Sequence, residues 1–177
     1  GHPYLYTEIQ SENDWRTMEV FDLKGKEIRH VGTSNDSPHG ALLNDPDGFY
    51  LTRRVDALGT YDAYRKFHVG ESGMPVAENE LYTKVNVCDS KEDEAALVST
   101  RELPVTMMEA DGSEKEERLP AGTKYYVRAT DLESFVDMEL SDGRRCRLAV
   151  KKSDKGWGFE IDGVYEEDCF EFIPYAG

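Results

Sequence analysis

The sequence has no long apolar run and few basic residues. No apolar stretch approaches the roughly 20 residues that a membrane-spanning helix requires. Lys and Arg number 21 against 36 Asp and Glu, a net charge of −15. Because this charge repels phosphates and anionic headgroups, we expect no nucleic-acid partner and no binding to an anionic membrane surface. The lack of an apolar run predicts no membrane insertion. The acidic excess favours solubility.

The chain begins Gly1-His2-Pro3 and lacks an initial Met and a signal peptide. We therefore expect a processed or trimmed fragment whose natural N-terminus lies elsewhere. For such a fragment, the missing signal does not argue against export.

Cysteines are also scarce. Cys88, Cys146 and Cys169 are an odd number at wide spacing, which indicates neither a disulfide framework nor a zinc knuckle. The alternation in "RRCRLAV" predicts that Cys146 points inward. In "DCFEFIPY" we expect Phe170 and Phe172 to be buried, which would turn Cys169 outward. The sequence therefore predicts three free thiols.

Common catalytic motifs are absent. There is no His-Glu-x-x-His, no Gly-x-Ser-x-Gly, no P-loop and no Gly-x-Gly-x-x-Gly. The histidines that could pair with a thiolate are His2, His30, His39 and His68. Cys88 is the thiol nearest a possible helix start, but the acidic residues that follow it favour the neutral thiol. We predict no catalytic residue and no cofactor.

The stretch "NDPDGFYLTRRVD" invites comparison with a calcium loop. With Gly48 at position 6 of an EF-hand, Asp45 and Asp47 fall at positions 3 and 5. Leu43 then occupies position 1 and Arg54 position 12, where acidic ligands are required. We therefore predict a turn that begins a strand, and no metal site.

Hydrophobic residues follow a period of two almost everywhere, which is typical of half-buried antiparallel strands. "SFVDMELSDG" and "GWGFEIDG" predict the following inward side chains: Val136, Met138, Leu140, Trp157, Phe159 and Ile161. Turns are predicted at the Asp-Gly pairs 47–48, 111–112, 142–143 and 162–163, and around Gly25 and residues 70–75. Short strands joined by such turns indicate an all-β protein.

Two domains are expected. Residues 89–95 form a charged linker with one helical turn at most, and 96–110 a strand region interrupted by Pro104. The boundary is placed near residue 90, which gives domains 1–90 and 91–177. Within the first, residues 15–28 align with 61–76 as a weak repeat of a β-hairpin, as in a meander or in propeller blades.

Aromatic residues are the strongest functional lead. The chain has ten Tyr, seven Phe and two Trp, more than a core of this size requires. Exposed aromatic rings make flat contacts with sugars, peptides or proteins. Tyr126 and Tyr165 are our candidate ligand-binding residues. The acidic stretch "YEEDCFEF" (165–172) is interpreted as a solvated strand edge.

Residues 96–175 resemble bacterial SH3-like domains in "LPVTMMEADG", "LPAGTKYYVRATD" and "SFVDMELSDGRRCRLAV". In such modules a Leu-x-x-Gly-Thr turn starts a strand, the role of Leu119, Gly122 and Thr123 here. Asp142 and Gly143 match the Asp-Gly hairpin turn. The Gly-Trp-Val sequence that usually follows the second hairpin of such modules is absent, and this chain has "RLA" at residues 147–149. The resemblance implies a small SH3-like β-barrel over 91–177.

The whole chain also resembles acidic, Tyr-rich, all-β secreted or lipid-anchored proteins (lipoproteins) of unknown function from Gram-positive gut anaerobes. This resemblance implies an extracellular or cell-surface location. The leading hypothesis is a non-catalytic binding or structural module for a cell-wall glycan, peptide or protein. The alternative is the accessory domain of a surface hydrolase whose catalytic part lies outside the fragment. A third, a complete enzyme, would require a site built from His39, His68 or the acidic residues.

Overall fold

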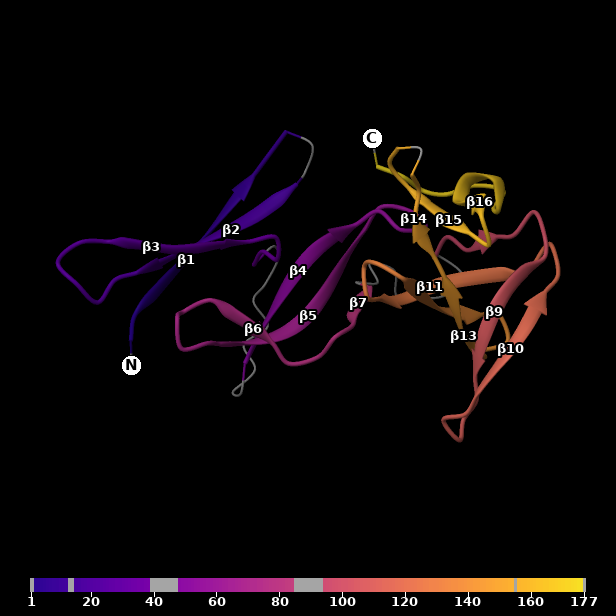
Figure 1. Cartoon of the computed structure of the whole chain (residues 1–177), viewed down its shortest axis with the longest axis horizontal. Coiled ribbons are helices and arrows are strands. Elements are labelled where there is room, and N and C mark those ends of the chain that lie inside the picture. Colours follow the sequence, from indigo (N-terminus) through magenta and orange to yellow (C-terminus); the bar gives the residue numbers. More distant parts are fainter. Residues whose placement is uncertain (1, 13–14, 39–47, 85–93, 155, 177) are drawn as a thin grey trace. The chain divides into compact units, whose positions relative to one another are not determined.

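The computed structural model describes residues 2–12, 15–38, 48–84, 94–154 and 156–176 (Figure 1). These residues form short strands and one 3₁₀ helix, so the predicted all-β class is confirmed. The described part contains no helix with the length and apolarity needed to cross a membrane. The chain divides into two compact units, one of residues 1–54 and 62–80 and the other of 55–61 and 81–176. The boundary expected near residue 90 lies outside the described residues.

The first unit is built from two groups of strands. One is an antiparallel sheet in the order β1-β2-β3, and in the other β5 lies between β4 and β6. The strands are β1 (Tyr4–Gln10), β2 (Arg16–Asp22), β3 (Arg29–Ser34), β4 (Phe49–Val55), β5 (Tyr61–Val69) and β6 (Pro75–Ala77). Alternate residues of three strands, Met18, Val20, Leu51 and Phe67, form its core.

The strand expected directly after "NDPDG" is present as β4. The strand begins at Phe49, directly after Gly48. A Cβ at Gly48 would lie 2.7 Å from the carbonyl oxygen of Phe67, so only glycine fits there without a shift of the backbone. Asp45 and Asp47 lie outside the described residues, and so does His39.

The second unit holds the larger share of strands. Its main antiparallel sheet runs in the order β10-β9-β13-β12-β11-β7, and β8 also pairs with β11. These are β7 (Tyr82–Lys84), β8 (Leu97–Val98), β9 (Leu103–Met108), β10 (Glu114–Leu119), β11 (Lys124–Thr130), β12 (Phe135–Leu140) and β13 (Arg145–Ala149). A small sheet follows, with β14 (Lys151–Lys152), β15 (Phe159–Ile161) and β16 (Val164–Tyr165), before the 3₁₀ helix η1 (Glu166–Asp168).

The predicted period holds in β12, where Val136, Met138 and Leu140 are buried. Asp137 on the other face is also buried. Its charge is compensated there, since both carboxylate oxygens accept hydrogen bonds from Arg147, at 2.7 and 3.1 Å. The predicted Asp-Gly turns at 111–112, 142–143 and 162–163 connect successive antiparallel strands. Each of these glycines has a positive φ, which glycine adopts at little cost.

Two finer expectations about architecture are not confirmed. None of the sheets among the described residues closes into a barrel, so the SH3-like barrel over 91–177 is not supported. The hairpin repeat of 15–28 and 61–76 stays a prediction.

Pro104 does not interrupt its strand. It lies inside β9, opposite Arg118 of β10. On the other side of β9 the pairing with β13 begins only at Thr106, so the missing N–H of Pro104 interrupts no ladder bond there.

The predicted alternation of inward and outward side chains is wrong near the C-terminus. Cys169 is fully buried rather than outward, and Phe172 is 70% exposed rather than buried, whereas Phe170 is buried as predicted. The physical reason is that β16 ends at Tyr165 and η1 follows, so the side chains no longer alternate between two faces. Cys146 is buried as predicted, and both described cysteines are free thiols. Cys88 lies outside the described residues.

Candidate functional site

The segment between β14 and β15 places a tryptophan on the surface. Trp157 lies between Gly156 and Gly158, both with positive φ, and its side chain is 60% exposed. The sequence predicted that Trp157 points inward. That prediction is wrong because β15 begins only at Phe159, so strand alternation does not reach the indole.

Two tyrosines hold this tryptophan. The ring of Tyr175 meets the Trp157 indole edge-to-face, with centroids 4.8 Å apart and an interplanar angle of 79°. The hydroxyl of Tyr165 donates a hydrogen bond to the carbonyl oxygen of Trp157 at 2.7 Å. Trp157, Tyr165 and Tyr175 are called the Trp157 surface below. Its indole is fixed from inside the unit while more than half of the side chain faces solvent.

Gly158 is the tightest point beneath this surface. A Cβ at this position would lie 2.5 Å from the Tyr165 hydroxyl and 2.9 Å from Oε1 of Glu166. Its φ of +93° is also a conformation that favours glycine. Position 158 therefore requires glycine for two independent reasons, the close approach of neighbouring atoms and the positive φ.

A buried carboxylate supports the surface from below. Glu166 is fully buried. Its Oε1 accepts a hydrogen bond from the N–H of Phe159 at 2.7 Å, and its Oε2 accepts one from the N–H of Leu58 at 2.8 Å. Burial raises the pKa of Glu166, although the Tyr175 hydroxyl and then both backbone hydrogen bonds oppose the rise. Sequence reasoning placed this residue on a solvated strand edge, which is wrong.

Glu166 also ties together segments that are distant in sequence. Leu58 has a positive φ of 58°, uncommon for a residue with a Cβ, and its N–H points at the carboxylate. The next turn is held by a hydrogen bond from the N–H of Thr60 to the carbonyl of Pro174 at 2.9 Å. With both oxygens engaged and no exposure, Glu166 is a structural group and not an available acid or base.

Of the two candidate ligand-binding residues, Tyr165 belongs to the Trp157 surface and Tyr126 does not. Tyr126 lies in β11 opposite Glu139, and the guanidinium of Arg128 lies 5.6 Å from the centre of its ring. Arg128 donates hydrogen bonds to Glu139 at 3.0 Å and to Glu94 at 2.9 and 3.0 Å. Tyr126 therefore packs beside an ionic network within the main sheet. No contact recorded among the described residues joins it to Tyr165.

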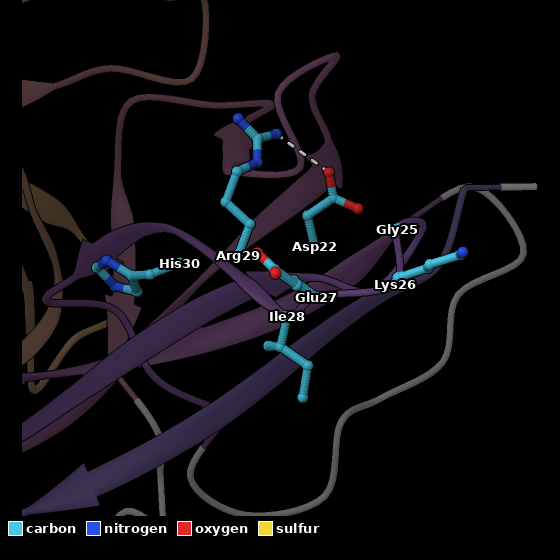
Figure 2. A pocket seen from close by; sticks show the side chains of 7 residues that line it. All are labelled: Asp22, Gly25, Lys26, Glu27, Ile28, Arg29 and His30. Carbon is cyan, nitrogen blue, oxygen red and sulfur yellow. Dashed lines mark hydrogen bonds and ion pairs between the residues drawn. The ribbon is translucent and has the colours of Figure 1, made fainter.

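A second feature is a surface hollow of about 610 Å³ at the turn between β2 and β3 (Figure 2). Figure 2 shows that the side chains of Lys26, Ile28 and His30 extend in different directions. The groups that line the hollow therefore do not converge on one point, as a catalytic or metal site requires.

Asp22 is the most heavily engaged polar group of this hollow. Arg29 donates to Oδ2 of Asp22 at 3.0 Å, as the dashed line in Figure 2 marks. The backbone N–H of Lys24 donates to Oδ1 at 2.9 Å, and Nε2 of His2 lies 2.7 Å from the same oxygen. The Lys24 hydrogen bond and then His2 hold the pKa of Asp22 well below its usual range. These contacts stabilise the hairpin.

A third feature is an apolar pocket of about 240 Å³ in the first unit, beside its core. It is lined by Tyr6, Met18, Pro38, Phe49, Leu51 and Val69. The hydroxyl of Tyr6 donates to the carbonyl of Gly73 at 2.7 Å, so the one polar group of this lining is satisfied elsewhere. Among the described residues, the lining offers no unengaged side-chain polar group that would orient a ligand.

The described residues contain no group of three or more His, Cys, Asp or Glu side chains placed to hold a metal ion. His30 pairs with Glu19 and His68 lies 3.7 Å from Glu78. Neither histidine is paired with a thiol in these contacts. Among the features described, the Trp157 surface is the one that presents a fixed, exposed aromatic group.

Comparisons of the chain with protein-family models, with curated proteins and with solved structures found no match. Function is therefore inferred from the residues themselves. Sequence reasoning identified Tyr165 but missed Trp157 and Tyr175. The available signal was the pair of glycines around Trp157, because glycine on both sides of an aromatic residue interrupts a strand.

Proposed function

We propose that the chain is a non-catalytic binding or structural module of a bacterial secreted or cell-surface protein. Its ligand, a cell-wall glycan, a peptide or a protein, contacts the Trp157 surface. Such a module would serve equally as the accessory domain of a surface hydrolase whose catalytic part lies elsewhere. Its location and partners follow from the resemblances of the sequence.

The observation that supports this proposal is the exposed, immobilised indole of Trp157. The edge-to-face contact with Tyr175 orients the ring before a ligand arrives, and the hydrogen bond from Tyr165 holds the backbone that carries it. A preorganised aromatic group loses little conformational freedom on binding, which is why tryptophan and tyrosine dominate binding surfaces. The buried, doubly hydrogen-bonded Glu166 beneath it provides rigidity and not acid–base chemistry.

The test is co-sedimentation of the purified chain with insoluble cell walls from a Gram-positive bacterium. Trp157→Ala is compared with Trp15→Ala, a matched control because the Trp15 side chain is 54% exposed. We expect saturable pelleting that Trp157→Ala abolishes or weakens and Trp15→Ala leaves unchanged. Equal pelleting of the two variants would contradict the role of Trp157, and no pelleting by the unmodified chain would contradict the cell wall as the ligand.

A further inference from the structure

The segment that builds the Trp157 surface is predominantly acidic, although Lys151 and Lys152 of β14 pair with β15 and Arg118 pairs with Asp162. Between residues 156 and 177 the sequence has no Lys or Arg. It has six acidic residues in this range: Glu160, Asp162, Glu166, Glu167, Asp168 and Glu171. This density exceeds the already acidic average of the chain, and it coincides with the segment that builds the surface.

Two of these carboxylates act directly on the aromatic groups. Glu166 lies buried below the surface, and Glu167 beside it is exposed. Burial raises the pKa values of Tyr165 and Tyr175, and the negative charges of Glu166 and Glu167 raise both further. The charges of Glu166 and Glu167 therefore make the field at the two hydroxyls more negative.

The indole adds to this field. The face of an aromatic ring carries the negative end of a quadrupole, and tryptophan attracts cations more strongly than tyrosine or phenylalanine does. Trp157 is more than half exposed, so a cation from solvent can approach it. Ring and carboxylates therefore favour the same sign of charge on a ligand, and they disfavour an anionic one.

Resting on the function proposed above, we propose that the Trp157 surface receives the cationic side chain of a lysine or arginine in a peptide segment of the partner. The ammonium or guanidinium group lies against the Trp157 indole and within electrostatic reach of Glu167. The edge contact of Tyr175 keeps the indole in place, and the hydrogen bond of Tyr165 holds the Trp157 backbone. Neutral sugars and acidic peptides bind this surface less well.

The experiment follows the two indole N–H signals of the ¹⁵N-labelled chain by NMR during titration with trilysine. Trp15 and Trp157 are the two tryptophans, so Trp15 is an internal control for non-specific attraction to a chain of net charge −15. The same peptide with every side chain acetylated removes the cation and keeps the length. We expect a saturable shift of the Trp157 signal with trilysine, a small one with the acetylated peptide, and little change at Trp15.

Charge-matched variants locate the carboxylate. Glu167→Gln and Glu133→Gln each remove one exposed negative charge from the second unit. Glu167→Gln is expected to weaken trilysine binding by about two- to fivefold, the effect of roughly 0.5–1 kcal/mol, whereas Glu133→Gln changes it little. Trp157→Ala is expected to weaken binding by at least as much as Glu167→Gln.

The outcomes separate the two proposals. Parallel shifts of both indole signals, or equal effects of the two Gln variants, would mean non-specific charge attraction and overturn the cationic-ligand inference. Pelleting with cell walls that depends on Trp157 but is indifferent to added trilysine would also overturn it, and would leave the binding module in place. Absence of pelleting together with a specific Trp157 shift would overturn the wall as ligand but not the surface.

Discussion

The Tyr165 hydroxyl donates a hydrogen bond to the Trp157 carbonyl oxygen at 2.7 Å. Tyr165 is the last residue of β16, and Trp157 lies two residues before β15, the strand that pairs with it. The bond joins the residue before η1 to the residue before Gly158. It fixes the backbone at Trp157, whose side chain faces solvent. The exposed indole is therefore a consequence of a defined backbone conformation and not of a loose loop.

Tyr165→Phe is expected to lower the free energy of unfolding by about 0.5–1 kcal/mol, because one hydrogen bond is lost near the surface. The measurement is chemical denaturation followed by circular dichroism. Tyr126→Phe is the control, since it keeps the ring that Arg128 contacts. An equal loss in both variants would mean that the Tyr165 bond contributes nothing particular to stability.

Gly158→Ala is expected to destabilise the protein more than Gly112→Ala does. Both glycines have a positive φ, +93° and +83°, so both variants carry the left-handed strain of roughly 1–2 kcal/mol. The added Cβ at Gly112 meets nothing within 4 Å, whereas at Gly158 it meets the Tyr165 hydroxyl at 2.5 Å. Thermal denaturation of the two variants measures the difference. Equal melting temperatures would contradict the packing of Tyr165 against Gly158.

Glu166→Gln is expected to destabilise the protein by about 1–3 kcal/mol at acidic pH. The two oxygens of Glu166 each accept a backbone N–H, and a glutamine side chain can replace only one acceptor. Its amide N–H₂ then faces a second N–H donor. Urea denaturation of both proteins gives this difference.

The stability difference between the unmodified protein and Glu166→Gln is expected to depend on pH. Burial raises the folded-state pKa of Glu166 above its usual 4.5, so the folded protein holds this proton more tightly than the unfolded chain. The stabilisation linked to this proton is complete below pH 4.5 and is lost as the pH rises through the folded pKa. The advantage of the unmodified protein over Glu166→Gln should therefore shrink as the pH rises above 4.5. An advantage that stays constant or grows with pH would contradict the raised pKa.

The thiols of Cys146 and Cys169 are expected to react slowly. Both are fully buried, and burial raises the pKa of Cys146 to about 12 and raises that of Cys169. In a Cys88→Ser background, labelling by a thiol-specific disulfide reagent should be slower by on the order of 100-fold in the native protein than in denaturant. Fast labelling of either thiol in the native state would place it at the surface.

Much of the local structure was predictable. The Asp-Gly turns and the inward side chains of β12 follow from short-range physics, because glycine permits positive φ and a pleated strand sends alternate side chains to opposite faces. The same rule failed at Trp157, Cys169 and Phe172, where no strand is present to impose a period of two. The candidate site lies in this irregular region, which is why sequence reasoning recovered Tyr165 and not its neighbours.

The sequence by itself determined the all-β class, the acidic character and most of the turns, since these depend on composition and on residues adjacent in the chain. The tertiary structure alone decided that Glu166 is buried rather than solvated. The donors that satisfy its carboxylate are the N–H groups of Leu58, 108 positions away, and Phe159. It also decided that Trp157 faces solvent, because the contact with Tyr175 and the hydrogen bond from Tyr165 form only when the C-terminal segment packs against the small sheet.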